Sequence, residues 1–180
     1  MGSSPSKRVE IELRNSPSFQ SAVANTYEEC MNLTQHAFPG PCLYQLLHAS
    51  TSVYTLLLSS SKDDPAAKIQ QKWLPQPPTQ LQIDRTLRKL KLLCNGKSAS
   101  LNLEEFQAFI LALFRDMALS NAFKSMAFYI PVGFLAILSS HLIAQRLPLI
   151  GPTYRTQGPK LPRIMAGYTA GTAAAVYINL

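Results

Sequence analysis

The chain has 180 residues and a net charge of +7, which is enough sequence for one soluble domain with a core of its own. All ten acidic residues lie at or before Asp116, whereas five of the 17 basic residues follow it. Acid-free apolar sequence with sparse flanking cations is typical of membrane segments, and a nucleic-acid binder would instead cluster its charges with aromatic residues, so nucleic acid is excluded as a partner.

Residues 1–15 are predicted to be a flexible arm. The opening Met1-Gly2-Ser3-Ser4-Pro5-Ser6 matches the N-myristoylation pattern, in which Gly2 becomes the acylated terminus. An unmodified polar tail is the alternative. Residues 9–13 read VEIEL, and this strict alternation favours a short strand or an extended segment. A single acyl chain binds membranes only marginally, so lipidation of Gly2 would need a second anchor.

Residues 16–122 are predicted to form a helical head. Ser16 followed by Pro17 supplies an N-cap and a first-turn proline for the first helix of the head. That helix ends near the Pro-Gly-Pro turn of residues 39–41. A second apolar stripe follows at helical spacing over residues 43–58, so the two helices should pack as an antiparallel hairpin.

Further helix signals follow the hairpin. A short helical run begins at Pro65 and ends near Trp73, where a proline-rich stretch interrupts the pattern. Thr79 and Gln82 then match a capping box that opens the next helix. That helix is the first half of a helix–loop–helix unit predicted over residues 80–118.

The loop of this unit ends Leu101-Asn102-Leu103-Glu104-Glu105-Phe106, which is the pattern of the second half of an EF-hand. Glu105 would hold the twelfth loop position, whose carboxylate closes a calcium site. The candidate calcium ligands are Glu105, Ser98, Ser100 and Asn102. Cys94 and Gly96 occupy two positions where calcium requires oxygen ligands, so we expect weak calcium binding or none. The alternative is an ordinary helical hairpin.

Several short stretches match a known family. They are the run from Ser6-Lys7-Arg8 through Asn15-Ser16-Pro17, Thr34-Gln35-His36-Ala37-Phe38, Lys72-Trp73-Leu74-Pro75, Pro77-Pro78-Thr79 and Glu104-Glu105-Phe106. On these stretches the chain resembles the small plant calcium-binding EF-hand family proteins over most of its length. The resemblance implies a single EF-hand-like unit and calcium binding. EF-hands usually work in pairs, and the turn over residues 38–42 is too short to be a second loop.

The two helices of the unit are predicted to leave an apolar groove between residues 83–93 and 106–117. Such a groove would receive the apolar face of a helix from a partner protein. Its lining residues are Ile83, Leu87, Leu90, Phe106, Phe109, Ile110 and Leu113.

Residues 123–180 are predicted to contain two membrane helices, at 126–144 and 164–180. The first is uncharged and about 28 Å long at 1.5 Å per residue, close to the roughly 30 Å hydrocarbon core of a bilayer. Gly133, Gly167 and Gly171 would let the two helices approach closely. The alternatives are two buried helices of a soluble core and a wedge in one leaflet.

The orientation of this hairpin stays open. A myristoylated N-terminus is cytosolic, and two spans would then place the basic loop, residues 145–163, on the far side of the membrane. That arrangement opposes the tendency of basic loops to remain in the cytosol. The sequence does not identify the membrane.

No group of residues indicates an enzyme, since the histidines lack partners at catalytic spacing and no phosphate-binding glycine loop is present. Three irregularly spaced cysteines indicate reduced, packed thiols. The expected fold is all-α: a helical-bundle head with an EF-hand-like unit, followed by a transmembrane helical hairpin.

The leading hypothesis is a non-enzymatic, membrane-tethered adaptor or regulatory protein whose head faces the cytosol. Its partners would be membrane lipid and another protein, with no small-molecule substrate and no resident cofactor except calcium if the loop binds it. The alternatives are a genuine calcium sensor and a structural protein that shapes or scaffolds the membrane.

Overall fold

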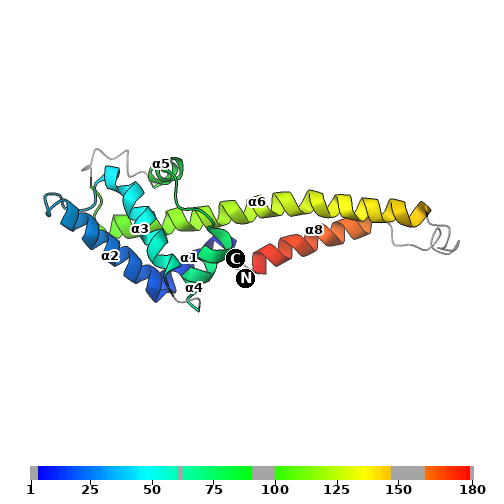
Figure 1. The fold of residues 1–180 in the computed structure, drawn as a ribbon, viewed down its shortest axis with the longest axis horizontal. Coiled ribbons are helices and arrows are strands. Elements are labelled where there is room, and N and C mark those ends of the chain that lie inside the picture. The colour runs from blue at the N-terminus through cyan, green and yellow to red at the C-terminus, as the bar shows by residue number, and fades with distance from the viewer. Residues whose placement is uncertain (1–3, 61–62, 91–99, 147–160, 179–180) are drawn as a thin grey trace. The chain divides into compact units, whose positions relative to one another are not determined.

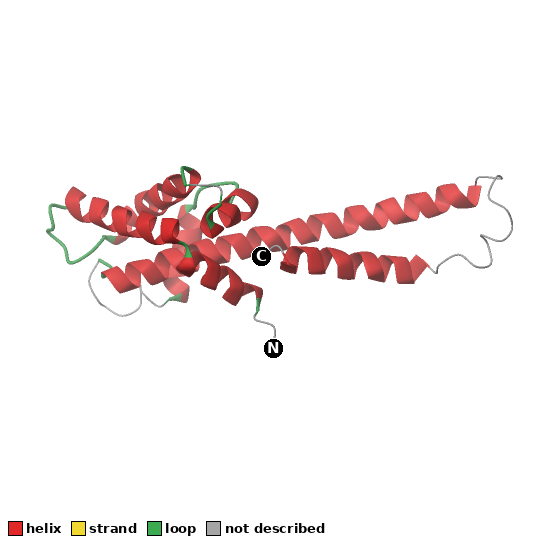
Figure 2. Cartoon of the chain, turned by 90° about the horizontal axis from the view of Figure 1, so that it is seen from below, coloured by secondary structure: helices red, strands yellow, loops and turns green. Residues whose placement is uncertain are grey.

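The computed structural model describes residues 4–60, 63–90, 100–146 and 161–178 (Figure 1). Within these residues the chain is all-helical, as predicted, and forms no strand (Figure 2). The elements are α1 (Pro5–Asn15), α2 (Pro17–Leu33), a 3-10 turn η1 (Leu43–Gln45), α3 (Leu46–Leu58), α4 (Pro65–Trp73), α5 (Gln80–Lys89), α6 (Leu103–Arg146) and α8 (Leu161–Ile178).

The chain divides into two compact units, Met1–Asn121 and Ala122–Leu180. The division lies one residue from the predicted boundary between head and membrane part. The first unit, called the head below, contains α1 to α5 and the first turns of α6. The second unit, called the tail, contains the rest of α6 together with α8.

The expectation of a flexible or extended N-terminal arm is wrong, because α1 is a helix packed on the head. Val9 and Leu13 are both fully buried, whereas Ile11 between them is 53 % exposed. An alternating sequence is also compatible with a helix, because residues four positions apart, such as Val9 and Leu13, lie on the same helical face. Arg115 of α6 also holds α1, through an ion pair of 3.0 Å with Glu10.

Helices α2 and α4 begin at a shared hydrogen-bonded cluster. Ser16 caps α2 as predicted, with its hydroxyl accepting from the backbone N–H of Phe19 at 3.1 Å. The carboxylate of Asp64 caps α4 and accepts from the hydroxyls of Ser16 at 2.6 Å and Ser18 at 2.7 Å. Asp64 is buried, so this cluster links two parts of the sequence that are 46 to 48 residues apart.

This cluster predicts a loss of stability in acid. Burial acts to raise the pKa of Asp64, but hydrogen bonds from Ser16, Ser18 and two backbone amides more than offset it, and its pKa lies below the usual 3.8. The ionised carboxylate therefore stabilises the fold above that value, and the stabilisation is lost as the pH falls through the lowered pKa.

We expect the urea midpoint of the wild type to fall between pH 5 and pH 3 more steeply than that of Asp64→Asn, measured by unfolding at each pH. Asp63→Asn is the matched control, since its side chain is exposed. It should keep the wild-type pH profile. Parallel profiles for the wild type and Asp64→Asn would contradict the assignment.

The predicted antiparallel hairpin of α2 and α3 is present, and its turn pairs with a distant segment. Cys42 forms an antiparallel bridge with Ser100, and the N–H of Leu101 donates to the carbonyl of Pro41 at 2.9 Å. A Cβ added at Gly40 would overlap the backbone carbonyl of Leu101. Only glycine therefore permits this approach, which joins the α2–α3 turn to the segment that precedes α6.

The first turns of α6 form the centre of the head. Phe106, Phe109 and Phe114 are fully buried. The ring of Phe106 lies 5.7 Å from that of Tyr27, and the ring of Phe114 lies 6.0 Å from that of Phe19. These two pairs match increasing positions on α6 with decreasing positions on α2, so the two helices run antiparallel.

In the tail, α8 runs beside the second part of α6 in both views (Figures 1 and 2). Helix α6 continues through Pro131, although a proline cannot donate a backbone hydrogen bond to the preceding turn. Close to this proline, the hydroxyl of Tyr168 on α8 donates to the carbonyl of Tyr129 at 3.0 Å. The two helices of the tail are thus joined where the α6 ladder is interrupted.

Candidate functional sites

Three of the four candidate calcium ligands, Ser100, Asn102 and Glu105, lie within the described residues. Asn102 and Glu105 cap the start of α6: the backbone N–H of Asn102 donates to the Glu105 carboxylate at 3.1 Å, and the N–H of Glu105 donates to the Asn102 side chain at 2.8 Å. Ser100 is buried in the bridge to Cys42. Ser98 lies outside the described residues.

This reciprocal capping gives Glu105 a structural role that requires no metal. Across the parts of the chain that are described, no group of three or more His, Cys, Asp or Glu side chains is placed to hold a metal ion. The capping pair itself could have been found from the sequence, because Asn102 and Glu105 have the capping-box spacing.

The prediction of an open partner groove between α5 and α6 is wrong, because the residues predicted to line it form part of the core of the head. Six of the seven side chains are 3 % exposed or less, and the seventh, Leu90, is half-buried. Helix α2 covers α6 through the aromatic pairs of Tyr27 and Phe19. In an isolated helix–loop–helix unit this apolar face would be exposed, but in the folded head the α2–α3 hairpin covers it. The buried residues are Ile83, Leu87, Phe106, Phe109, Ile110 and Leu113.

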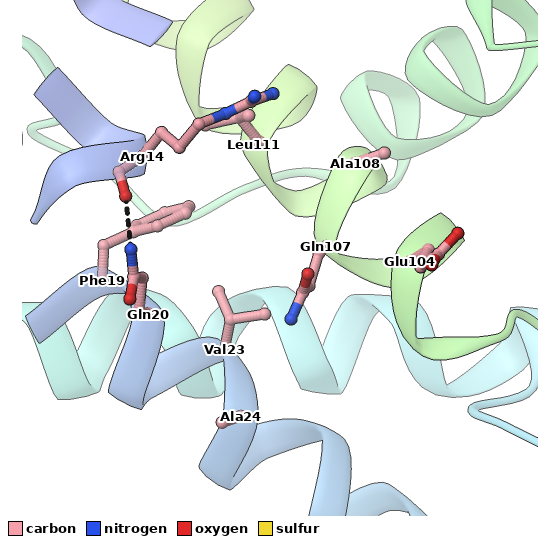
Figure 3. A pocket seen from close by; sticks show the side chains of 9 residues that line it. All are labelled: Arg14, Phe19, Gln20, Val23, Ala24, Glu104, Gln107, Ala108 and Leu111. Carbon is pink, nitrogen blue, oxygen red and sulfur yellow. Dashed lines mark hydrogen bonds between the residues drawn. The ribbon is translucent and has the colours of Figure 1, made fainter. Parts of the chain in front are cut away.

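An open groove lies along α2 and α6 (Figure 3). It has a volume of about 870 Å³, and its apolar lining includes Phe19 and Val23, which are almost fully buried, and the half-buried Leu111. Arg14 lies at the end nearest Leu111, and Glu104 lies at the opposite end (Figure 3). The remaining lining residues are Gln20, Ala24, Gln107 and Ala108. The sequence does not reveal this groove, because the groove depends on which faces of α2 and α6 meet.

Large apolar side chains of the tail are exposed. On α6, Phe128 is 66 % exposed and Leu135 is 68 % exposed. Among the described residues, the part of α6 from Leu103 to Ser139 is the one helical segment that is long and apolar enough to cross a membrane. Within it, an apolar window of 18 residues is 11 % buried inside the protein. The other exposed apolar residues of the tail are Phe123, Tyr129, Val132, Leu138 and Ile164.

The three glycines predicted to pack the tail helices have different surroundings. A Cβ added at Gly133 would overlap the ring of Tyr168, so this glycine permits the closest approach of α6 and α8. A Cβ added at Gly167 or Gly171 would meet nothing within 4 Å. The contact between α6 and α8 therefore combines one glycine with an aromatic ring, and the other two glycines lie outside it.

Two further groups of titratable residues can be described, the Cys30 thiol and the Glu29–His48 pair. Burial, with the charge of Glu29 as a second cause, raises the pKa of the Cys30 thiol to about 11, so this thiol stays protonated at neutral pH. Glu29 lies 3.3 Å from His48, an exposed pair that forms a salt bridge when the histidine is protonated. Gly2, the proposed lipidation site, lies outside the described residues.

No protein-family model, curated protein or solved structure matches this chain.

Proposed function

We propose that the protein is a non-enzymatic adaptor or regulatory protein, held at a membrane by residues 123–180, with its helical head in the cytosol. The observation that carries the proposal is the exposure of Phe128, Leu135 and their apolar neighbours on α6. Leaving such a side chain in water rather than burying it costs about 1.5–3 kcal/mol. Several of them on one helix therefore favour a lipid environment.

The surroundings of the tail support membrane insertion over a soluble core. A core helix of a soluble protein buries its apolar stripe against other elements, whereas the apolar 18-residue window of this helix is only 11 % buried. The hydrogen bond from Tyr168 to the Tyr129 carbonyl also suits a bilayer, where polar groups must find partners within the protein. We propose that α6 and α8 form a transmembrane helical hairpin.

The architecture of the head supports an EF-hand-like description. The turn between α2 and α3 is joined to the segment before α6 where the N–H of Leu101 donates to the carbonyl of Pro41, as two neighbouring helical pairs would be joined. The capping role of Glu105 and the poor ligand set of the loop favour weak calcium binding or none. Cys30 and Cys42 are free and buried, which supports placement of the head in the reducing cytosol.

Alkaline carbonate extraction of membranes carrying the full-length protein tests the proposed tether. We expect the protein to stay in the membrane pellet, as an inserted helix does, and release into the supernatant would contradict insertion. Protease added to sealed vesicles with the cytosolic face outward should digest the head. Protection of the head in the same vesicles would reverse the proposed orientation.

Calorimetry of the full-length protein in detergent tests the calcium alternative. We expect no binding heat at micromolar calcium. A heat of binding that disappears in Glu105→Gln would establish a calcium sensor in place of the adaptor.

A further inference from the structure

We propose that the groove between α2 and α6 is the docking site for one amphipathic helix of a partner protein, acidic at the end beside Arg14 and basic at the end beside Glu104. This inference rests on the proposed adaptor function and names the surface and the chemistry of its partner. All residues that line the groove belong to the head (Figure 3).

The dimensions of the groove suit two turns of a helix. Its α6 wall runs from Glu104 to Leu111, which are seven positions apart, or about 10 Å at 1.5 Å per residue. Two alanines, Ala24 on α2 and Ala108 on α6, line the groove and are exposed. Because these side chains are small, the backbone of a third helix can approach closely. A concave surface of this kind receives a convex occupant, so a second copy of the same groove does not fit it.

The backbone of the groove walls favours a helix over an extended peptide as the occupant. Both walls are α-helices, whose internal backbone N–H and carbonyl groups bond within each helix. An extended peptide would find no ladder of main-chain partners along these walls and would leave many of its own polar groups unpaired. A helix satisfies its backbone internally and can present an apolar stripe to Ala24, Ala108 and Leu111, the apolar lining residues that are not fully buried.

The charges at the two ends set the direction of the occupant. Arg14 carries the positive end, and its only ion pair within the described residues is an exposed one of 3.5 Å to Glu10. Glu104 carries the negative end from the first turn of α6. A partner helix with an acidic first turn beside Arg14 and a basic last turn beside Glu104 pairs with both charges. This order is also the favourable one for the macrodipole of the partner.

The expected partner pattern is therefore an acidic residue at position i, apolar residues at i+3 and i+4, and a basic residue at i+7. A library of helical peptides displayed on phage and randomised at these four positions provides the probe. Selection against the full-length protein in lipid nanodiscs should enrich the acidic–apolar–apolar–basic order. Enrichment of no sequence, or of sequences without this charge order, would overturn the proposal.

Fluorescence anisotropy with one selected peptide then tests the groove directly. We expect Arg14→Glu and Glu104→Lys each to weaken binding several-fold, and the double variant by about tenfold, because attraction of exposed charges becomes repulsion. A peptide with its two charged positions exchanged should recover binding to the double variant only. Glu28→Lys combined with Arg85→Glu makes a matched control, since both side chains are exposed outside the groove. It should bind like the wild type.

A third variant blocks the groove without altering charge. Ala108→Trp fills the space between the walls and should reduce binding at least tenfold, while circular dichroism shows unchanged helix content. Unchanged binding by Ala108→Trp, or failure of the exchanged peptide to recover the double variant, would contradict the docking site.

Two further readouts separate this inference from the others. A concentration-dependent dimer that Arg14→Glu disrupts would identify a second copy as the occupant and overturn the proposal. Retention in the carbonate pellet should be the same for all of these variants, so failure of the docking site and failure of the membrane tether give different results.

Discussion

Replacing Phe106 by alanine is expected to destabilise the head by about 3–5 kcal/mol, the usual result of removing a buried phenylalanine. Phe106 is fully buried and its ring packs against Tyr27 of α2, so truncation leaves a cavity between α2 and α6. Trp73 is the single tryptophan of the chain and is buried in the head, so its fluorescence reports unfolding by urea in detergent.

The matched control is Phe38→Ala, because the Phe38 side chain is 43 % exposed in the same unit. Surface substitutions of this kind usually change stability by about 0.5 kcal/mol or less. If Phe106→Ala and Phe38→Ala had equal effects, the α5–α6 face would be an open groove, as the sequence predicts, and not the core described above.

A second large effect is expected from the double substitution Leu135→Lys and Leu138→Lys. Both leucines are exposed on α6, at 68 % and 37 %. Near the middle of a membrane helix each lysine costs about 2.5–3.5 kcal/mol, so the pair opposes insertion by about 5–7 kcal/mol. We expect most of the variant protein to leave the membrane pellet on carbonate extraction.

The control for this variant is Leu56→Lys with Leu58→Lys, two exposed leucines of α3 in the head. It adds the same charge and should stay in the pellet. In a water-soluble protein the tail variant would only improve solubility. Identical recovery of the two double variants in the pellet would therefore count against a membrane-inserted tail.

Features encoded by neighbouring residues were predictable from the sequence. Ser16 with Pro17 begins α2, and Thr79 with Gln82 forms the predicted capping box of α5. The change from charged to apolar sequence likewise lies close to the division of the chain into two compact units after Asn121. Caps and composition are local, so one sequence contains what is needed to identify them.

Features that depend on distant residues were not predictable in the same way. The VEIEL segment fits a strand or a helix, and its helical form is stabilised by burial of Val9 and Leu13 within the head. The pairing of Pro41 with Leu101 joins two segments that carry no local signal for one another. The open groove has the same origin, since the packing of α2 on α6 decides which side chains remain outside.

The continuity of α6 has a consequence for biosynthesis. One helix supplies the centre of the head and, directly afterwards, the apolar residues of the tail. The head cannot complete its core until Phe114 has left the ribosome. At about 5–20 residues per second, the next 20 or so residues follow within roughly 1–4 s. Under the proposed membrane insertion, folding of the nascent head and capture of the emerging apolar segment overlap in time, and a chaperone or targeting factor that shields this segment would act before the head is finished.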